Sequence, residues 1–125
     1  MEGFTSKRID ELESIYHGAV RLAGDGLGVR SFGLQVLDLP AGFADYPEHD
    51  HAEDGQEEVY VVLEGSAELE VAGERLSADA GTMIRVEAEA RRKIVAGPYG
   101  VRILAIGCVP GAYERPESFR AAARA

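Results

Sequence analysis

The chain has 125 residues, 46% of them apolar, which is enough for one globular domain but leaves no room for separate cofactor and substrate domains. Its 22 acidic and 13 basic residues give a net charge of −9, which argues against non-specific binding to nucleic acid, since that requires a basic face. No apolar run approaches the ~20 residues of a membrane span, and the N-terminus lacks the apolar core of a signal peptide. The sequence therefore predicts a cytoplasmic protein.

A short helix is predicted for residues 6–17. Ile9, Leu12 and Ile15 recur at helical spacing, and Gly18 can end the helix. We expect this helix to pack on the outside of the main body of the protein.

Strands are predicted for residues 20–23 and 29–39, joined by a glycine-rich hairpin turn at residues 24–28. The glycines do not form a phosphate-binding loop in this prediction, because a strand pattern follows them where such a loop requires a helix. In the second strand Leu34 and Val36 point to one face, and Leu37 and Leu39 fall on the other.

Residues 42–65 contain the side chains best suited to chemistry. His49 and His51 are two positions apart, so both imidazoles face the same side if this segment is extended. Glu58 opens the next strand, and Tyr60 lies on the same face of it. Two neutral imidazoles and one carboxylate form a ligand set that zinc, iron, manganese, nickel or copper accepts. The alternative is that the two histidines are surface residues beside a solvated acidic loop.

The spacing of five residues in this segment resembles the first motif of the cupin superfamily: Gly42, His49, His51, Glu58 and Gly65. Six residues separate His51 from Glu58, where the family more often has three or four. Cupins are small antiparallel barrels, so the resemblance implies an all-β jelly-roll β-barrel. We expect residues 1–125 to form a single cupin domain, with the barrel core over about residues 20–110 and a helical tail at residues 116–125.

The second cupin motif is largely absent. Its spacing can be placed on Gly81, Glu87, Glu89, Arg92 and Ala96, where only the first glycine is retained. The position that usually supplies the last metal ligand is Arg92, and a guanidinium stays protonated and cannot coordinate a cation. The resemblance implies a metal held by three side chains, or a site without metal in which Arg92 binds a carboxylate or phosphate. Residues 87–91 are better helix formers than turn formers, so a looser or differently shaped bend is expected there.

The second half of the chain reads as further strands. Residues 59–63 are apolar on both faces, which is typical of a strand covered by an opposing sheet or a partner subunit, and we predict a homodimer. Strands are also predicted at residues 66–71, 82–86, 93–96 and 101–109. The last of these contains Arg102, which faces either the cavity or solvent, and Cys108, read as a small buried residue that cannot form an internal disulfide.

Two functions remain open from the sequence. The first is a metal-dependent enzyme, of oxygenase, isomerase or decarboxylase type, in which His49, His51 and Glu58 hold iron, manganese, nickel or zinc. Arg92 and Arg102 would then bind an anionic small molecule, and Tyr60 would act as a proton donor. The second is a metal-free module that binds or senses a small molecule without catalysis.

Overall fold

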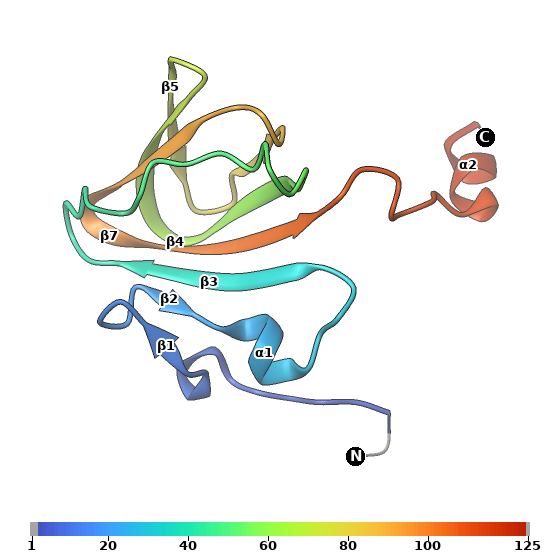
Figure 1. Cartoon of the computed structure of the whole chain (residues 1–125), viewed down its shortest axis with the longest axis horizontal. Helices are drawn as coiled ribbons and strands as arrows, with labels where there is room; N and C mark the ends of the chain where they lie inside the picture. The colour runs from blue at the N-terminus through green and yellow to red at the C-terminus, as the bar shows by residue number, and fades with distance from the viewer. Residues whose placement is uncertain (1–2, 125) are drawn as a thin grey trace.

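Two long antiparallel strands, β4 (Glu57–Val71) and β7 (Arg92–Cys108), form the centre of the fold. The structure is a computed structural model and describes residues 3–124. The other elements, in chain order, are η1 (Ile9–Glu11), β1 (Ser14–Ile15), β2 (Val20–Arg21), α1 (Ala23–Leu27), β3 (Gly33–Leu39), β5 (Glu74–Asp79), β6 (Met83–Val86) and α2 (Glu117–Arg124). Figure 1 shows β4 to β7 curled into a barrel, with β1, β2 and α1 beside β3 and with α2 standing apart.

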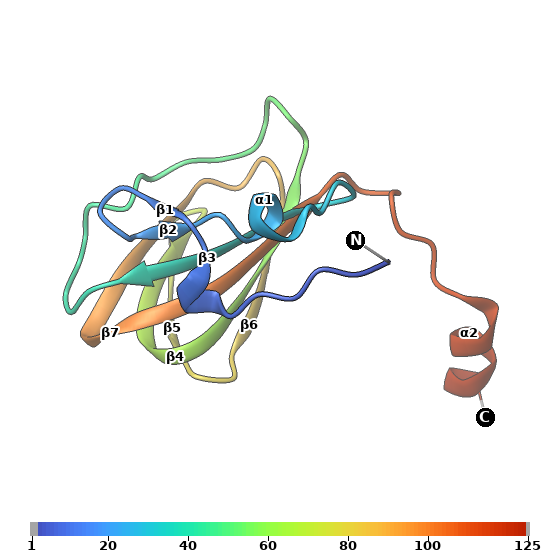
Figure 2. The same cartoon turned by 90° about the horizontal axis from the view of Figure 1, so that it is seen from below.

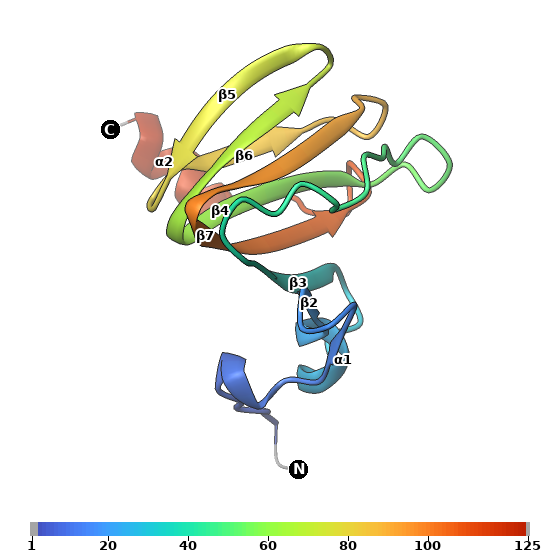
Figure 3. The same cartoon turned by 90° about the vertical axis from the view of Figure 1, so that its left-hand side faces the viewer.

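Both long strands bend, and each contributes to two facing sheets. Residues 57–65 of β4 pair with residues 101–108 of β7, and residues 67–71 pair with residues 92–96. The register shifts twice near Gly65, where the strand crosses from one sheet to the other. Strands β3 and β6 extend the first sheet, and β5 extends the second (Figure 3). The antiparallel barrel predicted from the sequence is confirmed.

The core lies between the two sheets and follows the alternation of side chains along each strand. Leu37, Leu69, Ile94 and Ile103 are fully buried, at 0% exposure, and belong to one apolar cluster. A smaller cluster on the outside of the first sheet packs Val36 against Leu12 and Ala23. The two predicted faces of β3 are therefore confirmed: one row enters the barrel and the other contacts the N-terminal segment.

The predicted helix at residues 6–17 is wrong. The structure has one 3-10 turn at Ile9–Glu11 and then the strand residues Ser14–Ile15, which pair with β2. The apolar residues at helical spacing do not share a face in the structure, because Leu12 is buried under α1 while Ile15 is 41% exposed at the sheet edge. Tertiary contacts override a weak helical pattern here.

The turn predicted at residues 24–28 is also wrong, because the short helix α1 occupies it. Gly28 ends this helix in the left-handed conformation, with φ of 79°, and donates hydrogen bonds to Gly24 and Asp25. Gly26 lies so close to Leu12 that a methyl group there would come within 2.7 Å of the leucine side chain. The glycines thus end a helix and allow close packing.

The bend expected to be loose at residues 87–91 is a hydrogen-bonded turn. The Ala90 amide donates to the Glu87 carbonyl at 3.2 Å, and Ala88 is buried at 6% exposure. The turn forms without proline or glycine because small alanines fit beneath the loop of residues 40–56. His51 also donates its amide to the Ala88 carbonyl.

The C-terminal helix predicted at residues 116–125 is present as α2, and residue 125 lies outside the described part of the chain. Within residues 3–124, no helix is both long and apolar enough to cross a membrane. The outward face of β4 carries the half-buried Val59 and Val61 and the exposed Leu63. The homodimer predicted from this apolar strand, like the single-domain organisation, stays a prediction.

Candidate metal and ligand site

Backbone hydrogen bonds fix both histidines at one end of the barrel. The loop of residues 40–56 lies against the first half of β7, where His49 and Arg92 exchange two backbone hydrogen bonds of 2.9 and 3.0 Å. The His51 amide donates to the Ala88 carbonyl at 2.7 Å. Glu58 opens β4 opposite Gly107 of β7. The three candidate ligands therefore come from a loop and a strand that β7 holds together.

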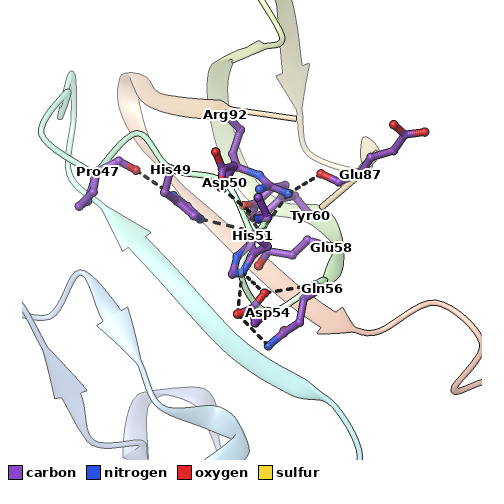
Figure 4. Close-up of polar contacts among 11 residues, drawn as sticks. Pro47, His49, Asp50, His51, Asp54, Gln56, Glu58, Tyr60, Glu87 and Arg92 are labelled. Carbon is purple, nitrogen blue, oxygen red and sulfur yellow. Dashed lines mark hydrogen bonds and ion pairs between the residues drawn. The ribbon is translucent and has the colours of Figure 1, made fainter. Parts of the chain in front are cut away.

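Hydrogen bonds at Nδ1 orient both imidazole rings (Figure 4). Nδ1 of His49 lies 3.0 Å from the Pro47 carbonyl, and Nδ1 of His51 lies 3.1 and 3.2 Å from the two carboxylate oxygens of Asp54. Both partners are acceptors, so each Nδ1 carries the proton and donates. In a neutral ring each Nε2 then keeps its lone pair, which is the arrangement of a metal-binding histidine.

The two Nε2 atoms converge on Glu58. Its Oε1 lies 3.2 Å from Nε2 of His51 and 3.9 Å from Nε2 of His49. One ligand atom from each of the three side chains lies within 4.8 Å of the others. Lone pairs and a carboxylate face one another across this gap and repel, so a cation or an added proton must lie between them. The donor set fits a divalent metal, and the cluster could hold one.

Tyr60 supports Glu58 from the core. Its hydroxyl donates to Oε1 of Glu58 at 2.7 Å, and the residue is 1% exposed. Burial, and then the charge of Glu58, raise the pKa of Tyr60 above its ordinary value, so the phenol keeps its proton. The structure places Tyr60 as a hydrogen-bond donor to the carboxylate, and its role as a catalytic proton donor stays a prediction.

Arg92 is the inward-facing member of the basic triplet. Arg91 pairs with Glu48 at 2.6 Å, and Lys93 donates to two carbonyls of the loop. Arg92 is 0% exposed, with Nη2 at 3.3 Å from the Glu87 carbonyl and 3.6 Å from Oε1 of Glu58. Within residues 3–124, its buried Nε and Nη1 have no hydrogen-bond partner. Of the three successive residues Arg91, Arg92 and Lys93, Arg92 is therefore the one whose side chain is buried.

Arg102 lies on the outer face of the barrel, which is the solvent side of the two orientations left open by the sequence, and its role in ligand binding stays a prediction. It alternates along β7 with Val101 and Ile103, which are buried in the barrel core. Its guanidinium binds Asp38 through Nε at 2.7 Å and Asp10 through Nη2 at 2.9 Å. Strand alternation places every second residue of β7 on the outer face, and the sequence alone did not fix which set Arg102 joins.

The pairing of Asp38 predicts a pH dependence of stability. Burial opposes its ionisation, but hydrogen bonds from Arg102 and Arg21, with their charges, outweigh burial and lower its pKa below the ordinary 3.8. A carboxyl group whose pKa is lower in the folded state stabilises the fold above its unfolded pKa. That contribution is lost as the pH falls through the folded pKa. Asp38→Asn should lower the free energy of unfolding at pH 6, and its difference from the parent should shrink as the pH falls below about 4.

Urea denaturation at several pH values would measure that difference. Glu74→Gln, a substitution at the exposed start of β5, is the control and should show no comparable dependence. A difference that stays constant from pH 6 to below about 3 would contradict the predicted role of Asp38.

Sequence reasoning missed two residues of the site. Asp54 was read as part of a solvated loop, although it follows His51 by three positions next to a turn glycine, which is the signal that could have identified it. The Gln56 amide and the His51 ring lower its pKa and keep it ionised as an acceptor. Tyr46 packs edge-on against His49, with ring centres 6.0 Å apart, and burial raises its pKa to about 12. No sequence signal distinguishes this tyrosine from the others.

Comparison with known proteins identifies solved structures that share this fold. No family model and no curated protein sequence matches the chain. Among solved structures, a cupin protein from Bacteroides fragilis is 24% identical, with a TM-score of 0.74 over 93% of this chain and 92% of that one. A sugar phosphate isomerase of the cupin superfamily from Silicibacter pomeroyi is 21% identical, with a TM-score of 0.68 over 82% of this chain and 74% of that one.

A cupin-2 domain containing protein from Shewanella frigidimarina is 18% identical, with a TM-score of 0.57 over 78% of this chain and 84% of that one. These likenesses, together with the barrel described above, show that the chain has the cupin fold, as the sequence motif predicted. Activity does not follow from fold, so the function must be argued from the site itself.

Proposed function

We propose that this protein binds a divalent metal through His49, His51 and Glu58, and a small organic anion beside it. The observation that carries the metal is the direction of the two rings. Both Nδ1 atoms lie beside acceptors of the protein, and the two Nε2 atoms lie 3.2 and 3.9 Å from the same carboxylate oxygen. A cation relieves the repulsion that this arrangement creates.

The ligand set favours iron, manganese, nickel or zinc. Three protein ligands leave coordination positions for water or for an oxygen of the bound molecule. When bound, such a metal supplies Lewis acidity or the ability to activate dioxygen. Asp54 and the Pro47 carbonyl hold the rings in place, and Tyr60 holds Glu58. An isomerase-type or oxygenase-type reaction on a small organic acid is the activity that we propose for this site.

The proposal of an anionic ligand rests on the burial of the Arg92 guanidinium. A buried guanidinium is stabilised only when acceptors surround it, and two of its three nitrogens have none within residues 3–124. A carboxylate or phosphate oxygen of the ligand would supply them in a charge-assisted hydrogen bond. The side chain is fully enclosed, so part of its surroundings must move before a ligand can reach it.

Metal analysis of protein purified without a histidine tag tests the proposal. We expect stoichiometric metal in the parent, and loss of it in the double variant His49→Ala, His51→Ala. The matched control is the third histidine of the chain, at position 17, which lies outside the cluster. His17→Asn should retain the metal, and asparagine tolerates the left-handed backbone found there. Metal content near zero in the parent, with stability unchanged by a chelator, would remove the metal from the proposal.

A metal-free binding or sensing module is the second candidate, and one observation favours it. The charged Nη2 of Arg92 is only 3.6 Å from Oε1 of Glu58, where it competes with a dication for the same carboxylate. In this case His51 is protonated and pairs with Glu58, and the ligand binds to Arg92 and the imidazoles. The metal analysis separates the two candidates.

A further inference from the structure

A side cavity opens on the candidate site at His49. It has a volume of about 330 Å³, and its wall includes His49 and Tyr46 of the loop, Tyr16 and Ile15 of the β1–β2 hairpin, Leu22, and Gln35 of β3. Figure 2 shows the turn between β1 and β2 beside the loop of residues 40–56. The volume is at the low end of the ~300–1,000 Å³ that small-molecule sites occupy. His49 belongs both to this cavity and to the metal-ligand cluster.

The wall of the side cavity is apolar and aromatic. Ile15, Tyr16, Leu22 and Tyr46 make up much of it, and no carboxylate, lysine or arginine is among its lining residues. This is unexpected in a chain with 22 acidic residues. A ligand with many hydroxyl groups would leave most of them without hydrogen-bond partners in the side cavity. The site should therefore bind such a ligand poorly. A planar apolar body would instead bury its faces against the two tyrosine rings.

The charged groups nearest to the side cavity lie at its His49 end. His49 and Arg92 are directly opposite across their β-bridge, so both side chains project to the same side of the loop and strand. The Tyr46 ring packs edge-on against His49, with ring centres 6.0 Å apart. A molecule in the side cavity would therefore have its charged end at His49, and its contact with the enclosed Arg92 requires the surroundings of that side chain to move.

The turn that supplies Tyr16 is strained. Tyr16 and His17 have φ of 55° and 57°, in the left-handed region that costs roughly 1–2 kcal/mol for each residue with a side chain. Tyr16 is 72% exposed, so its ring does not serve the core. Strain of this kind gathers at functional positions, and here it places an otherwise unused aromatic ring at the mouth of the side cavity.

We propose that the ligand is an aromatic carboxylic acid or a similar anion with a planar apolar body, and that Tyr16 is a specificity-determining residue for it. This inference rests on the proposed function for the anionic end. It excludes sugar phosphates as the preferred ligand class, because the side cavity lacks the polar partners that a sugar requires.

Isothermal titration of the purified protein, both as isolated and after loading with Zn²⁺, tests this with three probes: naphthalene-2-carboxylate, acetate and ribose 5-phosphate. Naphthalene-2-carboxylate should bind at least about tenfold more tightly than acetate, because its rings are buried in the side cavity. Ribose 5-phosphate should bind no more tightly than acetate.

Two matched variants of the strained turn isolate the role of the ring. Tyr16→Gly and His17→Gly remove the same left-handed strain, so both should fold, but only Tyr16 lies in the wall of the side cavity. Tyr16→Gly should weaken binding of naphthalene-2-carboxylate by about three- to tenfold and leave acetate unchanged. His17→Gly should change neither.

Equal affinity of the parent for naphthalene-2-carboxylate and acetate, or equal effects of the two variants, would overturn the aromatic ligand class and leave the proposed function standing. Tighter binding of ribose 5-phosphate than of either acid would also overturn it. Absence of bound metal together with absence of binding by any acid would overturn both this inference and the proposed function.

Discussion

Arg92→Met is expected to stabilise the ligand-free protein and to abolish its binding of anions. Replacing a buried ion pair with well-packed apolar side chains of similar volume often stabilises a protein, by about 1–4 kcal/mol, whereas removing a single partner leaves the other charge uncompensated. The effect that opposes this gain is destabilisation by the unpaired charge that remains, here on Glu58. Glu58 loses an ion pair but no hydrogen bond, because Nη2 of Arg92 is 3.6 Å from its Oε1 and Glu58 keeps the Tyr60 hydroxyl at 2.7 Å. The cost of burying Nε and Nη1 without hydrogen-bond partners is therefore expected to exceed the stabilisation lost with the ion pair.

Urea denaturation gives the change in the free energy of unfolding, and titration with acetate measures the loss of binding. Arg102→Met is the matched control, since that guanidinium is satisfied by Asp38 and Asp10. It should destabilise the protein by about 1–2 kcal/mol and leave acetate binding intact. If Arg92→Met destabilises the protein more than Arg102→Met does, the guanidinium is structural, and the case for an anion there fails.

Gly65→Ala is expected to prevent folding or to lower the free energy of unfolding by more than about 4 kcal/mol. Gly65 lies where β4 passes from one sheet to the other, with φ of 73°. A Cβ atom at this position would lie 2.1 Å from the Gly100 carbonyl oxygen of β7. The obstacle is backbone rather than a flexible side chain, so relief requires separating the two long strands that position Glu58.

Gly73→Ala controls for the conformational cost alone. Gly73 also has a positive φ, of 85°, but a Cβ atom there meets nothing within 4 Å. The control should lose only about 1–2 kcal/mol in urea denaturation. Similar losses in the two variants would mean that the close approach of β4 to β7 at Gly65 does not limit folding.

The barrel and the ligand triad could be predicted from the sequence because the signals are local. His49, His51 and Glu58 lie within ten residues at a spacing that resembles the cupin motif, although both histidines lie in a loop with a single bridge at His49. Of the hydrogen bonds that orient the two imidazole rings, only the one to Asp54 could be predicted, because Asp54 is near His51 in the sequence. The partner of His49 is the Pro47 carbonyl, a backbone group that any residue could supply.

The parts that were not predicted depend on contacts between distant segments. Arg102 joins the outer face because its neighbours Val101 and Ile103 fill the core, which a single strand pattern does not reveal. The side cavity forms only when the β1–β2 hairpin meets the loop of residues 40–56. The helical pattern at residues 6–17 is too short to persist against pairing of Ile15 with Val20.

The pairing of His49 with Arg92 and of Glu58 with Gly107 determines when the site can assemble during protein synthesis. All three metal-ligand side chains leave the ribosome before β7 does, yet β7 holds their backbone segments in register. On a nascent chain they are therefore separate, weak ligands with no fixed geometry. If the site binds the proposed metal or acid, loading must wait until translation has passed residue 107 and would draw on the pool available after synthesis.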